Sequence, residues 1–175
     1  MLAKPRMQRK IRHPEAEMHT RVDDTVRWLT ETAAFRSEET TAIVDVVGAD
    51  ARSWLQGQLS NDVRLLTRDR PVYTFVLTST GKVRADAWLL ERDGGIALLL
   101  PKSACSELLA SWRRFIVMED VELRSRPEEC AITVQGPVSG DLVQSAGLAL
   151  KSYSVDRMGF GGREILVNAT ALPAA

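Results

Sequence analysis

The stretch GADARSWLQGQLSNDVRLL, Gly48 to Leu66, decides how the rest of this sequence is interpreted. Its first half predicts a helix that Asp50 caps through its carboxylate and that buries Trp54 and Leu55. Its second half is rich in hydrogen-bonding side chains, namely Gln56, Gln58, Asn61 and Asp62. The stretch therefore marks either the end of a helix or part of a site.

Two interpretations of this polar half stay open. Asn tolerates the left-handed backbone in which many helices end, and an Asp carboxylate folds back onto nearby amides in a turn. Asn61 and Asp62 are therefore typical of a stop signal, which the turn preferences favour. Alternatively, these side chains shape the rim of a cavity above the neighbouring strands.

The segments around this stretch predict strands. The β-branched run 41–47 precedes it, and residues 71–79, 82–92 and 96–101 follow it, separated by the turns TSTG and Asp93-Gly94-Gly95. Two tight turns in succession predict an antiparallel three-stranded meander. Along residues 83–89, Val83, Ala85, Ala87 and Leu89 share one face of the strand.

The remaining segments complete the expected architecture. Apolar spacing predicts helices over 15–34, 102–116 and 138–147. Strands are expected at 118–125 and 130–136, and a hairpin over 150–157 and 163–169. Because hairpins interrupt the helices, we expect an α+β fold with mixed or antiparallel sheets and packed helices.

The composition excludes several classes of protein. The 23 basic residues balance the 23 acidic ones, so nothing global attracts nucleic acid or an anionic membrane. Two histidines offer little for a metal site, and Cys105 and Cys130 are expected to be free thiols in a reducing cytoplasm. Residues 1–14 are basic, lack an apolar core typical of a secretory signal, and are expected to form a flexible arm before a domain at 15–175.

One strand carries the strongest candidate for chemistry. Arg84, Asp86 and Trp88 alternate onto the face opposite Ala85. A carboxylate can accept two N–H bonds from a 2-amino-4-oxo ring, and an aromatic side chain can cover that ring. The alternative is a solvated sheet face with a weak ion pair, which strand geometry alone favours.

The run from Ile43 to Leu123 resembles the folate-binding superfamily of the glycine-cleavage T-protein (aminomethyltransferase) and the YgfZ-type proteins. The family pattern is a strand ending in G-x-D-A, a helix with F-L-Q-G-Q, a T/S-N-D step, a Y-T/A strand and a G-K/R-V turn. In this chain the pattern is carried, in order, by GADA (48–51), WLQGQ (54–58), SND (60–62), VYT (72–74) and GKV (81–83).

The resemblance implies a cavity for tetrahydrofolate, with the pterin-binding position of the family on Asp86. It implies further that Tyr73 and Trp88 wall the pterin and that Arg84 or Arg114 meets the glutamate tail. The remaining cavity residues implied by the resemblance are Gln58, Asn61 and Asp62. The YgfZ-type branch is the closer one, because Lys82 replaces a glycine common in T-proteins and ASWRRFIVMEDVEL (110–123) resembles the YgfZ-type helix that ends in an aromatic residue and enters the next strand. T-proteins usually carry two successive acidic residues where this chain has Ala85 and Asp86.

The resemblance also has gaps. The K-G-C-Y-x-G-Q-E motif of YgfZ-type proteins does not occur in this sequence, and the later family domains are expected to be absent. Three hypotheses follow: a tetrahydrofolate-binding YgfZ-like protein without a complete catalytic centre, serving iron–sulfur cluster maintenance or one-carbon metabolism; an aminomethyltransferase; or a shortened assembly module. The third implies a homo-oligomer or a partner chain that covers apolar surface.

Overall fold

The computed structural model describes residue 24 and residues 26–146 and 152–171. The expected basic arm at 1–14 lies outside the described residues, as does the first part of the expected helix at 15–34. Residues 24 and 26–31 are helical. Within the described residues, no helix has both the length and the apolar character needed to cross a membrane.

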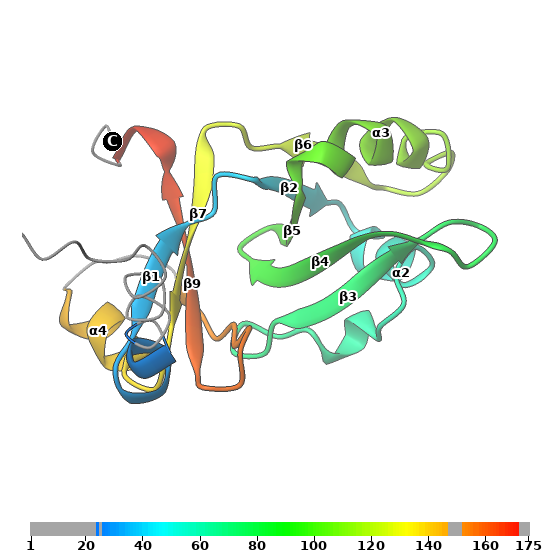
Figure 1. The fold of residues 1–175 in the computed structure, drawn as a ribbon. Coiled ribbons are helices and arrows are strands. Elements are labelled where there is room, and N and C mark those ends of the chain that lie inside the picture. Colours follow the sequence, from blue (N-terminus) through cyan, green and yellow to red (C-terminus); the bar gives the residue numbers. More distant parts are fainter. Residues whose placement is uncertain (1–23, 25, 147–151, 172–175) are drawn as a thin grey trace, which may run out of the picture.

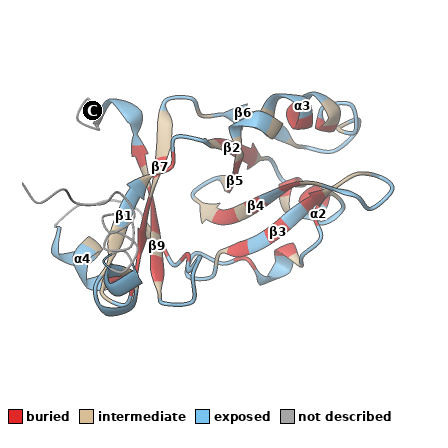
Figure 2. Cartoon of the chain, viewed as in Figure 1, coloured by how far each residue is buried: buried red, intermediate tan, exposed pale blue. Residues whose placement is uncertain are grey.

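A five-stranded antiparallel sheet forms the larger half of the fold (Figure 1). Its strands are β2 (Thr41–Val47), β3 (Val72–Leu77), β4 (Val83–Arg92), β5 (Gly95–Pro101) and β6 (Glu122–Ser125), in the order β3-β4-β5-β2-β6. The expected meander of β3, β4 and β5 is confirmed, and β2 pairs with β5 on one side and β6 on the other. Buried and exposed positions alternate along β3, as a strand with one covered face requires (Figure 2).

Helices cover one face of this sheet. They are α2 (Ala51–Gln56), the short 3₁₀ helix η1 (Val63–Leu65) and α3 (Lys102–Trp112). Trp54 of α2 and Trp112 of α3 meet edge to face with ring centroids 5.3 Å apart, inside the main apolar core. Such a pair contributes about 1 kcal/mol beyond the area it buries, so it fixes how the two helices sit on the sheet.

A second, four-stranded antiparallel sheet lies against the other face (Figure 1). It contains β1 (Ala34–Ser37), β7 (Glu129–Gln135), β8 (Ser152–Tyr153) and β9 (Gly162–Asn168), in the order β1-β7-β9-β8. The helix α4 (Ser139–Ser145) follows β7 in the chain, and the 3₁₀ turn η2 (Ala169–Ala171) follows β9. A small apolar core between the sheets contains Ile43, Leu90, Leu99, Ala131 and Tyr153.

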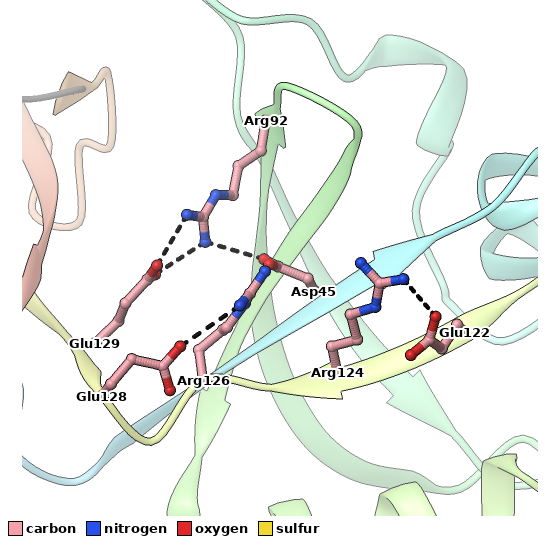
Figure 3. A network of polar contacts seen from close by, with 7 residues as sticks. All are labelled: Asp45, Arg92, Glu122, Arg124, Arg126, Glu128 and Glu129. Carbon is pink, nitrogen blue, oxygen red and sulfur yellow. Dashed lines mark hydrogen bonds and ion pairs between the residues drawn. The ribbon is translucent and has the colours of Figure 1, made fainter.

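A charged network also joins the two sheets (Figure 3). Asp45 of β2 is only 5% exposed, and its carboxylate accepts from Arg92 of β4 (3.0 Å) and from Arg126 (2.6 Å). Arg92 also forms a two-bond contact with Glu129 of β7, at 2.9 and 3.0 Å. Because these charges are partly withdrawn from water and mutually satisfied, they hold β7 in one position over β2.

The expected α+β class with antiparallel sheets is confirmed, while several boundaries differ. The expected helix at 15–34 ends near Thr32, and β1 occupies residues that the pattern did not mark as strand. α3 ends at Trp112 rather than at 116, because the backbone turns at 113–115. β6 begins at Glu122 rather than at 118.

The expected cap on α2 is wrong. The carboxylate of Asp50 makes no hydrogen bond to its own helix and instead accepts from the Asp120 N–H at 2.8 Å. The Asp120 carboxylate in turn accepts from Ala49 N–H at 3.0 Å. Gly48 makes this close exchange possible, since its φ is 117° and a Cβ there would lie 2.0 Å from the Asp120 carbonyl oxygen.

Candidate functional site

Two neighbouring strands place a polar and aromatic row on the face of the sheet away from α2. Tyr73 and Phe75 come from β3, and Asp86 and Trp88 come from β4. Tyr73 lies opposite Trp88 in the register, and Phe75 lies opposite Asp86. The expected sharing of one face by Asp86 and Trp88 is therefore confirmed, while Ala85 and Ala87 point into the core.

The aromatic side chains of this row form one continuous wall. The Tyr73 and Trp88 rings are tilted by 52° with centroids 5.2 Å apart, and the Phe75 ring meets Tyr73 edge-on at 5.5 Å. Rings this close pack against each other and leave no room for a third ring between them. A flat ligand would therefore lie on this wall rather than between two of its members.

Asp86 is exposed at the edge of that wall, where its carboxylate accepts a hydrogen bond of 3.2 Å from the Tyr73 hydroxyl. Partial burial, followed by the charge of Asp86, raises the pKa of Tyr73, so this hydroxyl stays a donor across the physiological range. The second oxygen of Asp86 has no hydrogen-bond partner among the described residues. It is an acceptor available to a ligand.

A loop after β8 completes the surroundings of Asp86. Arg157 places its guanidinium 6.0 Å from the centre of the Trp88 ring. Two cavities, of about 360 and about 520 Å³, share Asp86, Trp88 and Arg157 in their walls. The volumes lie in the range of small-molecule sites.

Asp156 shapes this loop. Burial alone would raise the pKa of its carboxyl, but the amides of Gly161, Gly159 and Met158 donate to it and lower the pKa below its usual value. The loop that carries Arg157 is thus held by an ionised carboxylate at its base.

The polar half of the opening stretch covers the outer edge of β3, which would otherwise expose unpaired backbone groups. The hydrogen bonds run from Leu77 N–H to the Gln58 carbonyl (3.3 Å), Ser60 N–H to the Phe75 carbonyl (2.9 Å), Phe75 N–H to the Ser60 hydroxyl (3.0 Å) and the Asn61 side-chain amide to the Tyr73 carbonyl (2.9 Å). The segment therefore positions the strand that carries Tyr73.

Individual expectations for this segment had mixed outcomes. Asn61 is not in a left-handed conformation, since no described residue other than glycine has a positive φ. Asp62 folds back as expected and accepts from the Arg64 N–H at 2.9 Å, and its ion pair with the Arg64 guanidinium lowers the pKa of its carboxyl. The side-chain oxygen of Gln56, at the end of α2, accepts from the N–H of Val63, at the start of η1, at 2.7 Å.

Other sequence-derived candidates lie apart from Asp86. Arg84 turns toward α3, where its guanidinium donates to Ser111 (2.8 Å) and Glu107 (2.9 Å). With Gln58 it lines a different cavity of about 560 Å³. Arg114 is exposed just beyond the end of α3, and Asn61 and Asp62 line none of these cavities. The structure brings together Tyr73, Asp86 and Trp88 only.

Sequence reasoning missed Arg157 and the residue that holds it. Glu164 of β9 is 0% exposed, and its carboxylate accepts from two nitrogens of Arg157 at 3.3 and 3.1 Å. A glutamate directly before the apolar run Ile165–Val167, in a segment expected to form a strand, was the one signal that pointed to it.

Cys105 and Cys130 are both half-buried free thiols, as expected, and burial raises the pKa of each. The thiol form therefore dominates at neutral pH, which makes both cysteines poor nucleophiles. No group of three His, Cys, Asp or Glu side chains is arranged to hold a metal ion in the part of the chain that the structure describes.

Curated proteins with similar sequences carry two different names. An aminomethyltransferase of Alcanivorax borkumensis is 31% identical over 106 residues, which cover 61% of this chain and 29% of that protein. The tRNA-modifying protein YgfZ of Vibrio atlanticus is 29% identical over 102 residues, which cover 58% of this chain and 31% of that protein. The matched part of this chain thus spans about 30% of these relatives.

Two solved structures share the fold. The glycine cleavage system aminomethyltransferase T of Bartonella henselae has a TM-score of 0.65 at 17% identity, over 78% of this chain and 42% of that one. The heterotetrameric sarcosine oxidase of Corynebacterium sp. U-96 has a TM-score of 0.52 at 12% identity, over 79% of this chain and 76% of that one. A family model described as the GCVT N-terminal domain matches residues 2–171. This chain belongs to the family of the GCVT N-terminal domain.

Proposed function

We propose that this chain binds tetrahydrofolate through Asp86, and that it acts as a YgfZ-like protein in iron–sulfur cluster maintenance or one-carbon metabolism. The observation that carries the proposal is the placement of Asp86. Its carboxylate stands on an open cavity, oriented by Tyr73, next to the exposed edge of an aromatic wall. A carboxylate in that position can accept from the 2-amino group and N3–H of a pterin while the ring lies on Trp88.

The glutamate tail of the ligand needs a cation farther along the surface. Arg84 would first have to leave Glu107, to which it is bonded at 2.9 Å. Arg114 forms no ion pair with any described residue and is exposed at the end of α3, so it is the cation we assign to the tail. An exposed contact of this kind adds little affinity, and the ring carries most of the binding.

Calorimetry with 5-formyltetrahydrofolate tests this proposal. We expect the wild-type chain to bind it and Asp86→Ala to weaken the affinity by at least about tenfold, because a charged hydrogen bond is lost. Asp141→Asn, at an exposed position on α4 away from the cavities, is the matched control and should bind like the wild type. No heat at millimolar ligand, or equal affinity in Asp86→Ala, would contradict the proposal.

The aminomethyltransferase similar to this chain supports a second candidate, transfer of the carbon of a lipoyl-bound aminomethyl group to tetrahydrofolate, with the amino group leaving as ammonia. Asp86 is the carboxylate that faces the cavity from β4 and would have to act near the folate nitrogen. An assay for methylenetetrahydrofolate with a lipoylated carrier protein separates this candidate from binding alone. If the chain binds folate but forms no methylenetetrahydrofolate in this assay, the enzymatic role is excluded.

A third candidate is an assembly module. Phe115, Val117 and Met118 follow one another beyond α3 and are 59%, 81% and 93% exposed. Apolar side chains gathered in this way are typical of surface that a second chain covers. Light scattering that shows a strict monomer would count against this role without affecting folate binding.

A further inference from the structure

The buried carboxylate of Glu164 holds Arg157 in the cavity wall. Glu164 is fully buried, and one of its oxygens accepts from both Nε and Nη2 of Arg157. The other oxygen, Oε1, has no hydrogen-bond partner among the described residues. Since an uncompensated buried charge is costly, Glu164 strongly restrains where the Arg157 guanidinium can lie.

The main chain and an aromatic ring restrain Arg157 further. Its N–H donates to the Gln135 side chain at 2.9 Å, and its guanidinium lies 6.0 Å from the centre of the Trp88 ring. Burial and the charge of Asp86 raise the pKa of the Tyr73 hydroxyl that is bonded to Asp86, and the positive charge of Arg157 opposes this rise. The third guanidinium nitrogen, Nη1, has no acceptor among the described residues, in a cavity wall that Arg157 shares with Asp86.

The cavity thus has an acceptor, the second carboxylate oxygen of Asp86, and a donor, Nη1 of Arg157, among the groups that line it. A 2-amino-4-oxo pteridine offers the complementary pair, because its 2-amino group and N3–H are donors and its 4-oxo group is an acceptor. A 2,4-diamino pteridine places a donor where the 4-oxo group would be, facing N–H groups that cannot accept.

We infer that Arg157 determines the specificity of this site by donating to the 4-oxo group of a pteridine whose amino edge Asp86 holds. Glu164 is then a positioning residue, which acts through Arg157 and touches no ligand. The inference rests on the proposed function, since it needs a pteridine on Asp86.

Folic acid and aminopterin form a matched pair of probes, because they differ at position 4 of the ring, oxo in one and amino in the other. We expect calorimetry to show that the wild-type chain prefers folic acid by at least about tenfold. Arg157→Met should reduce this preference by about tenfold, mainly through weaker binding of folic acid. An unchanged preference in Arg157→Met would overturn the inference.

Matched variants separate specificity from folding. Arg163→Met changes an arginine on β9 that lies against Gly140 of α4, and should keep the wild-type preference. Because Arg157→Met leaves the buried carboxyl of Glu164 without its partner, the double variant Arg157→Met/Glu164→Gln replaces that carboxyl and should also lose the preference. Glu164→Gln alone should lower the preference in the same direction, since Arg157 loses its charged anchor, and an unchanged value would contradict the positioning role.

The outcomes distinguish the two proposals. If the wild-type chain binds folic acid and Asp86→Ala does not, while Arg157→Met keeps the wild-type preference, the proposed function stands and this inference fails. If the wild-type chain binds folic acid, aminopterin and 5-formyltetrahydrofolate no better than Asp86→Ala does, both fail together.

Discussion

The hydroxyl of Tyr73 on β3 donates to the carboxylate of Asp86 on β4 across a distance of 3.2 Å. The two residues are diagonal neighbours in the register, since Tyr73 lies opposite Trp88. The contact uses one oxygen of Asp86 and leaves the other toward the cavity. This diagonal pair orients the group on which the proposed ligand site depends.

Removing that hydroxyl should weaken ligand binding without unfolding the chain. In Tyr73→Phe, Asp86 loses one restraint, and we expect the affinity for 5-formyltetrahydrofolate to fall about threefold to tenfold. Since Tyr73 is 40% exposed, the free energy of unfolding should change by less than about 0.5 kcal/mol. Calorimetry and urea denaturation measure the two quantities, and a large loss of stability with unchanged affinity would show that the pair is only structural.

The polar segment beside β3 predicts a contrast between two neighbouring amides. Asn61→Ala removes the bonds to the Tyr73 carbonyl and the Asp62 N–H, so it should cost about 1 kcal/mol of stability and also lower folate affinity. Gln58→Ala removes a side-chain amide that makes no hydrogen bond to any described residue, and should cost less than about 0.5 kcal/mol. Urea denaturation compares them, and equal costs would mean that the edge of β3 is held by the backbone bonds alone.

The charged network between the sheets should be the more sensitive part of the fold. Asp45→Ala leaves Arg92 and Arg126 without their shared carboxylate, and we expect a loss of about 3 kcal/mol. Glu122→Ala breaks only the exposed pair with Arg124 and should cost less than about 1 kcal/mol (Figure 3). Similar thermal shifts for the two variants would refute a role of Asp45 in joining the sheets.

Glu164 predicts a pH dependence of known sign. Burial raises the pKa of its carboxyl above the ordinary value of a glutamate, and the charge of Arg157 offsets part of that rise. The folded state therefore binds this proton more tightly than the unfolded state, so the contribution of Glu164 to stability is full below its unfolded pKa and is lost as the pH rises through the folded pKa.

Glu164→Gln cannot titrate and removes this contribution. We expect the stability of the variant relative to wild type to improve as the pH is raised from the ordinary glutamate pKa of 4.5 through neutral pH. Denaturation of both proteins across that range gives the difference, with Glu107→Gln at an exposed position as the control. If the stability of the variant relative to wild type fell as the pH rose, the pKa of Glu164 would be lower in the folded state than in the unfolded state.

Local patterns were sufficient to predict much of this fold. Alternation along residues 83–89 correctly placed Ala85 and Ala87 in the core and Asp86 and Trp88 on the opposite face, and tight turns correctly predicted the meander. β1 was missed because its four residues form an edge strand whose one aromatic side chain, Phe35, is 81% exposed. Such a strand forms by pairing with β7 and carries little signal of its own.

The missed parts of the candidate site depend on contacts between distant segments. The Asp50 carboxylate accepts from the N–H of Asp120 rather than from its own helix, and a local capping rule cannot predict a partner so distant in the sequence. Arg84 and Asp86 alternate onto one face, yet α3 draws Arg84 away through Glu107 and Ser111. Arg157 reaches Trp88 only because β9 carries Glu164 beneath it. Tertiary packing, which periodicity does not encode, decided each of these positions.

A crystal structure of the chain with 5-formyltetrahydrofolate is the most direct test of the account. It should show the pteridine ring lying on Trp88, with the free carboxylate oxygen of Asp86 at about 2.9 Å from a ring nitrogen, the usual length of an N–H···O bond. A ligand bound elsewhere on the chain, with the Asp86 carboxylate facing only solvent, would contradict it.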